Sequence, residues 1–248
     1  MKAMILAAGL GTRLRPLTDD GPKALVEVAG RTLLEITLTR LSSFGLRDVI
    51  INVHHFADKI VDYLRIHDNF GMRVEISREE ILLDTGGGLK EAGWFFLEDS
   101  AAAEEPFILH NVDILSTIDL RRMVEVHIEK KALATLAVQQ RDSSRVLLFD
   151  ENRRLCGRRA GRDREPEIVC SSANLQPRAF CGVHVISPRL LRMMQQKGAF
   201  SIIDSYLRLA ARGEDILGFP ADEYYWRDLG KLSDLAQANQ DVGAGTLL

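Results

Sequence analysis

The sequence has little that would mark a disulfide-rich, metal-ribbon or membrane protein. Its 248 residues include three cysteines, Cys156, Cys170 and Cys181, and no two of them form a Cys-x-x-Cys pair. This odd count predicts neither a zinc ribbon nor a disulfide framework and favours small, partly buried thiols in a reducing compartment. No apolar run approaches the ~18 residues of a membrane span. We therefore expect a cytoplasmic protein with no membrane partner.

Excess positive charge and aromatic side chains are also scarce. The chain has 32 Lys and Arg against 35 Asp and Glu, for a formal net charge of −3 at pH 7. It has only 10 Phe, 4 Tyr and 2 Trp, too few to suggest an aromatic platform for stacked bases. We expect no nucleic-acid partner, although a local basic pocket remains compatible with this balance.

What the sequence does contain is a regular alternation of apolar runs and helical periods as far as Lys131. Thr32 can cap a helix with an apolar face at Leu34, Leu38 and Leu41, and Gly45 can end it. Strands alternating with helices predict a parallel sheet covered on both faces. The predicted strands of this part are 2–8, 47–53, 72–76 and 107–109. The predicted helices are those around 34–41, 60–64, 86–94 and 120–128.

The pattern changes after Lys131. Strand-like runs follow one another with little helix between them, which predicts an antiparallel, β-rich substrate subdomain over about 132–187. Helical periods return near 190–194 and 202–209, and a last helix covers about 232–242. No linker separates two cores, so 1–248 is predicted to be a single domain. The fold class is therefore α/β, with three layers, a mostly parallel mixed central sheet and a small antiparallel excursion.

The strongest local feature is a glycine-rich loop that follows the first strand. It reads Leu-Ala-Ala-Gly-Leu-Gly-Thr-Arg over 6–13 and reaches Pro22-Lys23 ten residues later. Glycines let backbone N–H groups approach a phosphate, and Arg13 and Lys23 supply charge for a polyanion. A dinucleotide fingerprint fails because Leu14 replaces its third glycine, and a P-loop fails because Lys23 follows a proline. A tight turn with two solvated basic residues is the alternative interpretation.

Four blocks of sequence resemble the sugar-1-phosphate nucleotidyltransferases. The first is the loop L-A-A-G-L-G-T-R-L-R-P-L-T with P-K-A-L, and the second is Asp84-Thr85-Gly86-Gly87-Gly88. The others are Asn111-Val112-Asp113 and the late W-R-D-L-G block over 226–230. Their order covers roughly 1–235, and the T-G-G-G turn and short length are most similar to short bacterial uridylyl- and guanylyltransferases. The resemblance implies a Rossmann-like fold.

The resemblance also implies a site. The late aspartate Asp228 and the strand-end Asp113 would be the ligands of Mg²⁺, the cofactor. Arg13 would hold the β- and γ-phosphates, and Lys23 would lie at the α-phosphate, which makes these two the catalytic residues. Asn174 and Asp204 are the candidates for contacts with the sugar phosphate. The implied nucleotide-binding residues are Leu6, Ala7, Ala8, Gly9, Gly11, Thr12, Arg13, Lys23, Thr85, Gly86 and Asn111.

The implied reaction joins a nucleoside triphosphate and a sugar 1-phosphate, with in-line attack on the α-phosphorus and release of pyrophosphate. Phosphate monoester oxygens are already ionised near neutral pH, so no general base is needed. Two alternatives stay open: a metal-dependent glycosyltransferase that uses Asn111-x-Asp113, and a non-catalytic nucleotide sensor. The base, the sugar, the number of metal ions and a homo-oligomeric state also stay open. Several arginines crowd residues 153–164. We interpret this segment as a solvated, charged hairpin in preference to a clamp for an anionic substrate.

Overall fold

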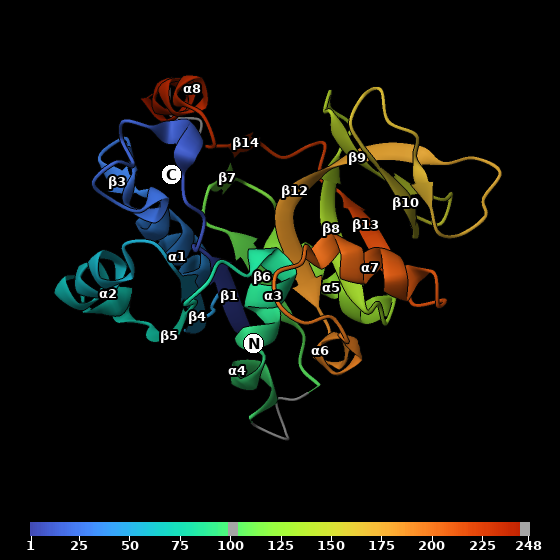
Figure 1. Cartoon of the computed structure of the whole chain (residues 1–248), viewed down its shortest axis with the longest axis horizontal. Coiled ribbons are helices and arrows are strands. Elements are labelled where there is room, and N and C mark those ends of the chain that lie inside the picture. Colours follow the sequence, from blue (N-terminus) through green and yellow to red (C-terminus); the bar gives the residue numbers. More distant parts are fainter. Residues whose placement is uncertain (99–103, 244–248) are drawn as a thin grey trace.

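The computed structural model describes residues 1–98 and 104–243, and a ten-stranded mixed sheet forms its centre (Figure 1). The strands lie in the order β11-β10-β9-β12-β6-β1-β4-β5, and β8 pairs with both β12 and β13. Their bounds are β1 Lys2–Leu6, β4 Asp48–Val53, β5 Arg73–Arg78, β6 Phe107–Asn111, β8 Ala134–Gln139, β9 Arg145–Phe149, β10 Leu155–Ala160, β11 Glu167–Ile168, β12 Gln176–Ile186 and β13 Ile216–Pro220. Two small sheets pair β2 Glu27–Val28 with β3 Arg31–Thr32 and β7 Ile114–Ser116 with β14 Trp226–Asp228.

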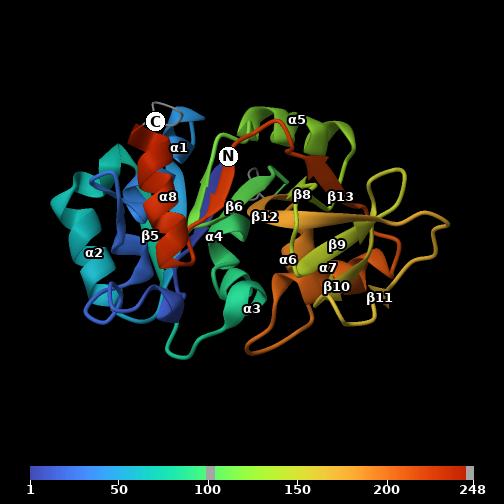
Figure 2. The same ribbon diagram turned by 90° about the horizontal axis from the view of Figure 1, so that it is seen from above.

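Helices cover both faces of the sheet, so the predicted three layers are confirmed (Figure 2). One apolar core lies under α1 Leu33–Ser43, α2 Ala57–Ile66, α5 Leu120–Glu129 and α8 Leu232–Gly243. The other lies under α3 Asp84–Glu91, α4 Trp94–Leu97, α6 Arg189–Met193 and α7 Ile202–Ala210. Short 3₁₀ turns occur at Thr12–Leu14, Lys23–Leu25 and Asp68–Gly71. In the described ranges, none of the helices combines the length and the apolar composition needed to span a bilayer.

The parallel half of the sheet consists of β6, β1, β4 and β5. Strand β1 pairs in parallel with both β4 and β6, so it is buried on both faces, which explains its continuous apolar sequence. Successive side chains alternate between the two cores: Ala3 and Ile5 enter one, and Met4 enters the other. The side chain of Thr32 accepts a hydrogen bond from the Glu35 N–H at 3.0 Å, which confirms the predicted helix cap.

The antiparallel half is built on the long strand β12, which curves from the upper right of Figure 1 down into the centre of the sheet and joins the two halves. Its last residues pair with β6, whereas its first residues pair with β9. Gly182 lies between these segments with φ of +73°, where the register against β8 also shifts. Only glycine adopts this conformation without strain, so Gly182 lets the strand bend and pair with β9 at its start and with β6 at its end. The predicted antiparallel excursion is confirmed.

The predicted helix over 86–94 is wrong in its extent. Two helices, α3 and α4, replace it, with Gly93 between them. Asp84 begins α3 with a positive φ of 58°, a backbone conformation that sequence periodicity does not reveal. The small strand β7 was not predicted, because its three residues carry no periodic signal of their own.

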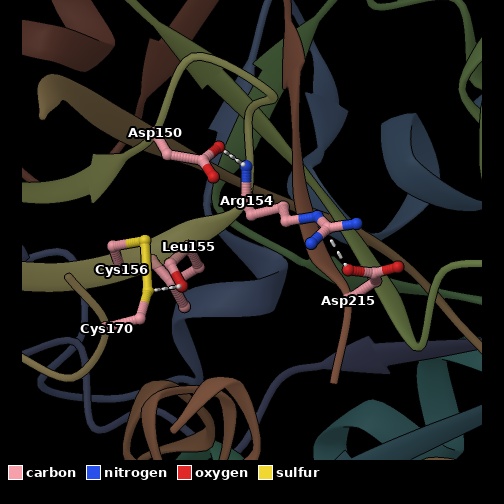
Figure 3. The surroundings of a disulfide bond; sticks show 6 residues. All are labelled: Asp150, Arg154, Leu155, Cys156, Cys170 and Asp215. Carbon is pink, nitrogen blue, oxygen red and sulfur yellow. Dashed lines mark hydrogen bonds and ion pairs between the residues drawn. A yellow bond between two sulfur atoms is a disulfide. The ribbon is translucent and has the colours of Figure 1, made fainter. Parts of the chain in front are cut away.

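The structure also corrects the prediction of three free thiols. Cys156 and Cys170 form a disulfide, and Cys181 is free and buried (Figure 3). The β10–β11 pairing turns the chain back, and the Val169 N–H donates to the Cys156 carbonyl at 2.8 Å. This brings the two Cα atoms to 4.8 Å although the cysteines are 14 residues apart in sequence. This hairpin cannot be predicted from the spacing of the cysteines. It is therefore the physical reason why the prediction of three free thiols is wrong.

The disulfide predicts a thiol count and a response to reduction. Unfolded protein kept away from reductant should titrate one thiol per chain, and three after reduction. Reduction should also lower the free energy of unfolding by up to about 3 kcal/mol, the loop-closure effect of a bridge of this span. Urea unfolding of the Cys156→Ser/Cys170→Ser variant should not respond to reductant. Three thiols in the untreated protein would contradict the bridge.

Candidate active site

A cavity of about 550 Å³ opens at the carboxyl ends of the parallel strands. In open α/β sheets this edge is where ligands bind, because the loops that leave the strands converge there. We call it the main cavity. Its lining residues are Leu6, Ala7, Ala8, Gly9, Leu10, Gly11, Thr12, Arg13, Lys23, Asn52, Glu79, Leu82, Asp84, Thr85, Asn111, Val112, Asp113, Ala199 and Gly230.

Most residues of the predicted nucleotide site line this cavity, but four predicted residues do not: Gly86, Asn174, Asp204 and Asp228, the last of which lies beside the lining residue Gly230. Gly86 is buried, and its N–H donates to the Phe200 carbonyl at 2.9 Å instead of facing the cavity. Asn174 is exposed between β11 and β12 and does not line the main cavity. Asp204, at the start of α7, lines a second cavity next to the main one.

The glycine-rich loop is folded tightly against Lys23. Gly11 has φ of +66°, and a Cβ added there would lie 3.0 Å from Thr18 Cγ2 and 3.1 Å from Lys23 Cβ. The Thr18 hydroxyl donates to the Gly11 carbonyl at 2.9 Å, which fixes this arrangement. The absence of a side chain at Gly11 therefore lets the loop close around the base of the lysine.

Opposite charges meet at one end of the main cavity. The Lys23 ammonium pairs with a carboxylate oxygen of Asp113, and the lysine is only 8% exposed. Asp113 follows β6, and its carbonyl accepts a hydrogen bond from the Leu229 N–H at 2.8 Å. Because β14 pairs with β7, Asp228 lies opposite Ile114, the residue after Asp113. The two aspartates, 115 positions apart in the sequence numbering, are thus brought together by a two-stranded sheet.

The Asp228 carboxylate lacks hydrogen bonds that would stabilise its charge. Its Oδ1 is buried and has no hydrogen-bond partner among the described residues. Burial raises the pKa of Asp228, the negative charge of Asp113 raises it further, and Lys23 and Arg13 oppose the rise. The Arg13 guanidinium lies close by: a Cβ at Gly230 would meet both Asp228 Oδ1 at 2.7 Å and Arg13 Nη2 at 2.8 Å. A further cation beside the two aspartates would relieve this electrostatic cost.

Sequence reasoning missed two polar residues that support the loop. Asn52 is 2% exposed; its Oδ1 accepts from the Ala7 N–H at 2.8 Å, and its Nδ2 donates to Glu79 Oε1 at 2.6 Å. The other Glu79 oxygen accepts from the Leu83 N–H at 2.9 Å. This bridge ties the end of β1 to the segment that enters α3. The available signal was a single amide inside the apolar run Ile50-Ile51-Asn52-Val53.

The second cavity, of about 730 Å³, shares Asp84, Thr85 and Asn111 with the main one. We call it the arginine cavity because Arg145, Arg158, Arg159 and Arg164 line it. Arg158 pairs with both Asp204 and Glu167. The favoured interpretation of this segment as a solvated hairpin is therefore wrong for Arg158, which α7 partly covers.

Replacing Asn52 should destabilise the fold. Asn52→Leu leaves the Ala7 N–H and the buried Glu79 carboxylate without their partner, which predicts a loss of about 3 kcal/mol in the free energy of unfolding. Urea unfolding measures this loss. The matched control is Asn174→Leu at an exposed position, for which a change within about 0.5 kcal/mol is expected. Equal midpoints for the two variants would contradict the bridging role.

Comparison with known proteins agrees with this geometry. The chain is 33% identical to the N-acetylmuramate alpha-1-phosphate uridylyltransferase of Caulobacter vibrioides over 240 residues, 92% of this chain and 91% of that protein. It is 26% identical to a mannose-1-phosphate guanyltransferase of Yarrowia lipolytica, covering 94% of this chain and 62% of that protein. HddC of Yersinia pseudotuberculosis, solved with GMP-PN, has the same fold, with a TM-score of 0.74, 22% identity and coverage of 97% and 99%.

The family profile described as "Nucleotidyl transferase" matches residues 2–147. This match takes in the glycine-rich loop, the T-G-G-G turn and the strand that ends before Asp113. It favours the predicted transferase over the glycosyltransferase and sensor alternatives. The chain therefore belongs to the sugar-1-phosphate nucleotidyltransferases, enzymes that transfer a nucleotidyl group from a nucleoside triphosphate to a sugar 1-phosphate and form a nucleotide sugar.

Proposed function

We propose that the chain uses Mg²⁺, held by Asp113 and Asp228, to transfer a uridylyl group from UTP to a sugar 1-phosphate. The observation that carries the proposal is the meeting of two carboxylates, Lys23 and Arg13 at one end of the main cavity. Reaction between two anionic substrates needs positioning and charge neutralisation above all. This cluster contains the charges for both.

The donor set suits Mg²⁺. Within the described ranges, no three His, Cys, Asp or Glu side chains gather into a group that could hold a metal alone. Mg²⁺ does not need such a group, because it commonly combines one or two carboxylates with water and substrate phosphate oxygens. The partnerless buried Oδ1 of Asp228 and the raised pKa of that carboxyl both favour a cation there. Bound Mg²⁺ would neutralise phosphate charge in the transition state.

The protein side chains have separate tasks in this proposal. An oxygen of the sugar 1-phosphate forms a bond to the α-phosphorus of the triphosphate, and the bond from that phosphorus to the β-phosphate oxygen breaks. Pyrophosphate leaves with the bonding electrons, and no proton has to move. Lys23 stabilises the negative charge at the α-phosphate. Arg13, at the end of the glycine-rich loop, holds the β- and γ-phosphates as they become pyrophosphate.

The uridine donor is supported by relatedness. The Caulobacter relative, which is named a uridylyltransferase, matches over 92% of this chain and 91% of its own length. The Yarrowia guanyltransferase is less similar, and the match spans 62% of that protein. The solved structure with GMP-PN is 22% identical and bears on the fold alone. The backbone of Leu6 to Gly9, which lines the main cavity, would contact the base and ribose.

Removing either aspartate should abolish metal-dependent catalysis. Asp113→Asn and Asp228→Asn are expected to lower kcat/KM about a hundredfold or more, since each removes a charge that holds the cation. Titration with Mg²⁺ under pyrophosphate readout measures the effect. Asp62→Asn, on α2, is the matched control because Asp62 is exposed, pairs with Arg65 and lies outside the main cavity and the charges that act on Asp228. Unchanged Mg²⁺ dependence in both site variants would refute the metal assignment.

The donor is tested by a matrix of triphosphates against sugar 1-phosphates. We expect UTP to release pyrophosphate with a kcat/KM at least about tenfold above that of GTP, CTP, dTTP and ATP, a difference of about 1.4 kcal/mol. Release should require the sugar 1-phosphate. Equal or greater use of GTP would refute the uridine assignment but leave the family reaction intact.

A further inference from the structure

The arginine cavity adjoins the reaction centre, and the following inference rests on the proposed function. It shares Asp84, Thr85 and Asn111 with the main cavity, so a ligand can extend from one cavity into the other. Asn111 ends β6 two residues before Asp113, and its side-chain oxygen is buried without a partner among the described residues. A sugar whose 1-phosphate reaches the main cavity would therefore project its ring toward the arginines.

The direction of the arginine side chains follows from the β9–β10 pairing. Arg158 lies opposite Leu147, and both face α7: Arg158 pairs with Asp204, and Leu147 packs in the core that contains Ile202. Because side chains alternate along a strand, Arg145, two residues before Leu147, shares this face, and Arg159 points to the other. The Arg164 side chain lies against Gly161, with its Cγ 3.1 Å from a Cβ built there. Arg145, Arg158 and Arg164 line the cavity, and Arg159 also lines it although its side chain leaves β10 on the opposite face.

The charges on this face are not balanced. Arg158 is neutralised by Asp204 and Glu167, with the Glu167 contact at 2.8 Å. Arg145 and Arg164 form no ion pair with any carboxylate in the described ranges. Phe180 and His184 also line the cavity, but burial holds the pKa of His184 down at about 3, so its ring is neutral. Four arginines line the cavity against two aspartates, Asp84 and Asp204, so net positive charge remains beside a site that would hold the sugar ring.

The wall that carries these charges is fixed in place. A disulfide joins Cys156, on β10, to Cys170, which follows β11 (Figure 3). Cys156 lies two residues before Arg158 on the strand. Arg154, the residue before β10, pairs with Asp215, at 3.0 Å, just before β13. The disulfide bridge closes the hairpin that contains Arg158 and Arg164, whereas the side chains of Arg145 and Arg164 are exposed and accessible to a ligand.

We infer that the acceptor is a sugar 1-phosphate with a second anionic group, a carboxylate or a second phosphate, which Arg145 and Arg164 bind in the arginine cavity. A neutral hexose 1-phosphate would leave both guanidinium groups without an anionic partner. The second anion therefore determines specificity among acceptors, while the transfer chemistry stays at Lys23 and the two aspartates.

Three acceptors that share the glucose ring test this inference. Glucose 1-phosphate is the neutral reference, glucuronic acid 1-phosphate adds a carboxylate, and glucose 1,6-bisphosphate adds a phosphate. Calorimetric binding and kcat/KM should both favour at least one acidic acceptor over the reference by about tenfold or more, as expected for one charge-assisted contact. The acidic acceptor that gains tells whether the cavity takes a carboxylate or a phosphate.

The arginine variants test the residues. Arg145→Met and Arg164→Met should each reduce the preference for the acidic acceptor about tenfold, mainly through KM. Arg162→Met is the matched control, because Arg162 is exposed, pairs with Asp142 and does not line the cavity. Equal binding of acidic and neutral acceptors, or a preference that survives both cavity variants, overturns the inference. Failure of the proposed function gives a different result, because no sugar 1-phosphate would then cause pyrophosphate release from a triphosphate. The calorimetric preference between acidic and neutral acceptors would still test this inference in that case.

Discussion

The close approach of Asp113 and Asp228 is the constraint on which the rest of the site depends. Two carboxylates that repel each other are held together by the β7–β14 pairing, one of them with a buried, partnerless oxygen. Lys23 and Arg13 reduce this repulsion but leave the pKa of Asp228 raised. The fold therefore maintains an arrangement that is unfavourable by itself, and such arrangements are typical of sites that await a cation and an anionic ligand.

In the proposed function, each half of the sheet contributes to the binding of a different substrate. The parallel half ends in the glycine-rich loop, which is supported by the bridge from Asn52 to Glu79. The antiparallel half supplies the arginine cavity, and β12 connects the halves through Gly182. Asn111 lies where they meet. The mild negative charge of the whole chain is compatible with anionic substrates, because the positive charge is concentrated in these two cavities.

Sequence patterns predicted the layers, the order of most strands and helices, and the loop that lines the main cavity. They succeeded because apolar periodicity and glycine spacing are local signals. They failed where the outcome depends on distant pairing: the disulfide, the bridge at Asn52 and the environment of Arg158 all arise from contacts between separate segments. Asn174 was assigned to the sugar site by its position along the chain, and the structure leaves it exposed outside the main cavity.

The central claim is a direct, in-line transfer in which Lys23 acts as a cation paired with Asp113 and forms no covalent bond to the nucleotide. The stereochemical course at the α-phosphorus tests it most directly. One diastereomer of UTP with sulfur on the α-phosphate would be converted to the nucleotide sugar, and the configuration of the product determined. A single displacement predicts inversion. Retention would indicate a covalent nucleotidyl-enzyme and would contradict the roles assigned to Lys23 and the aspartates.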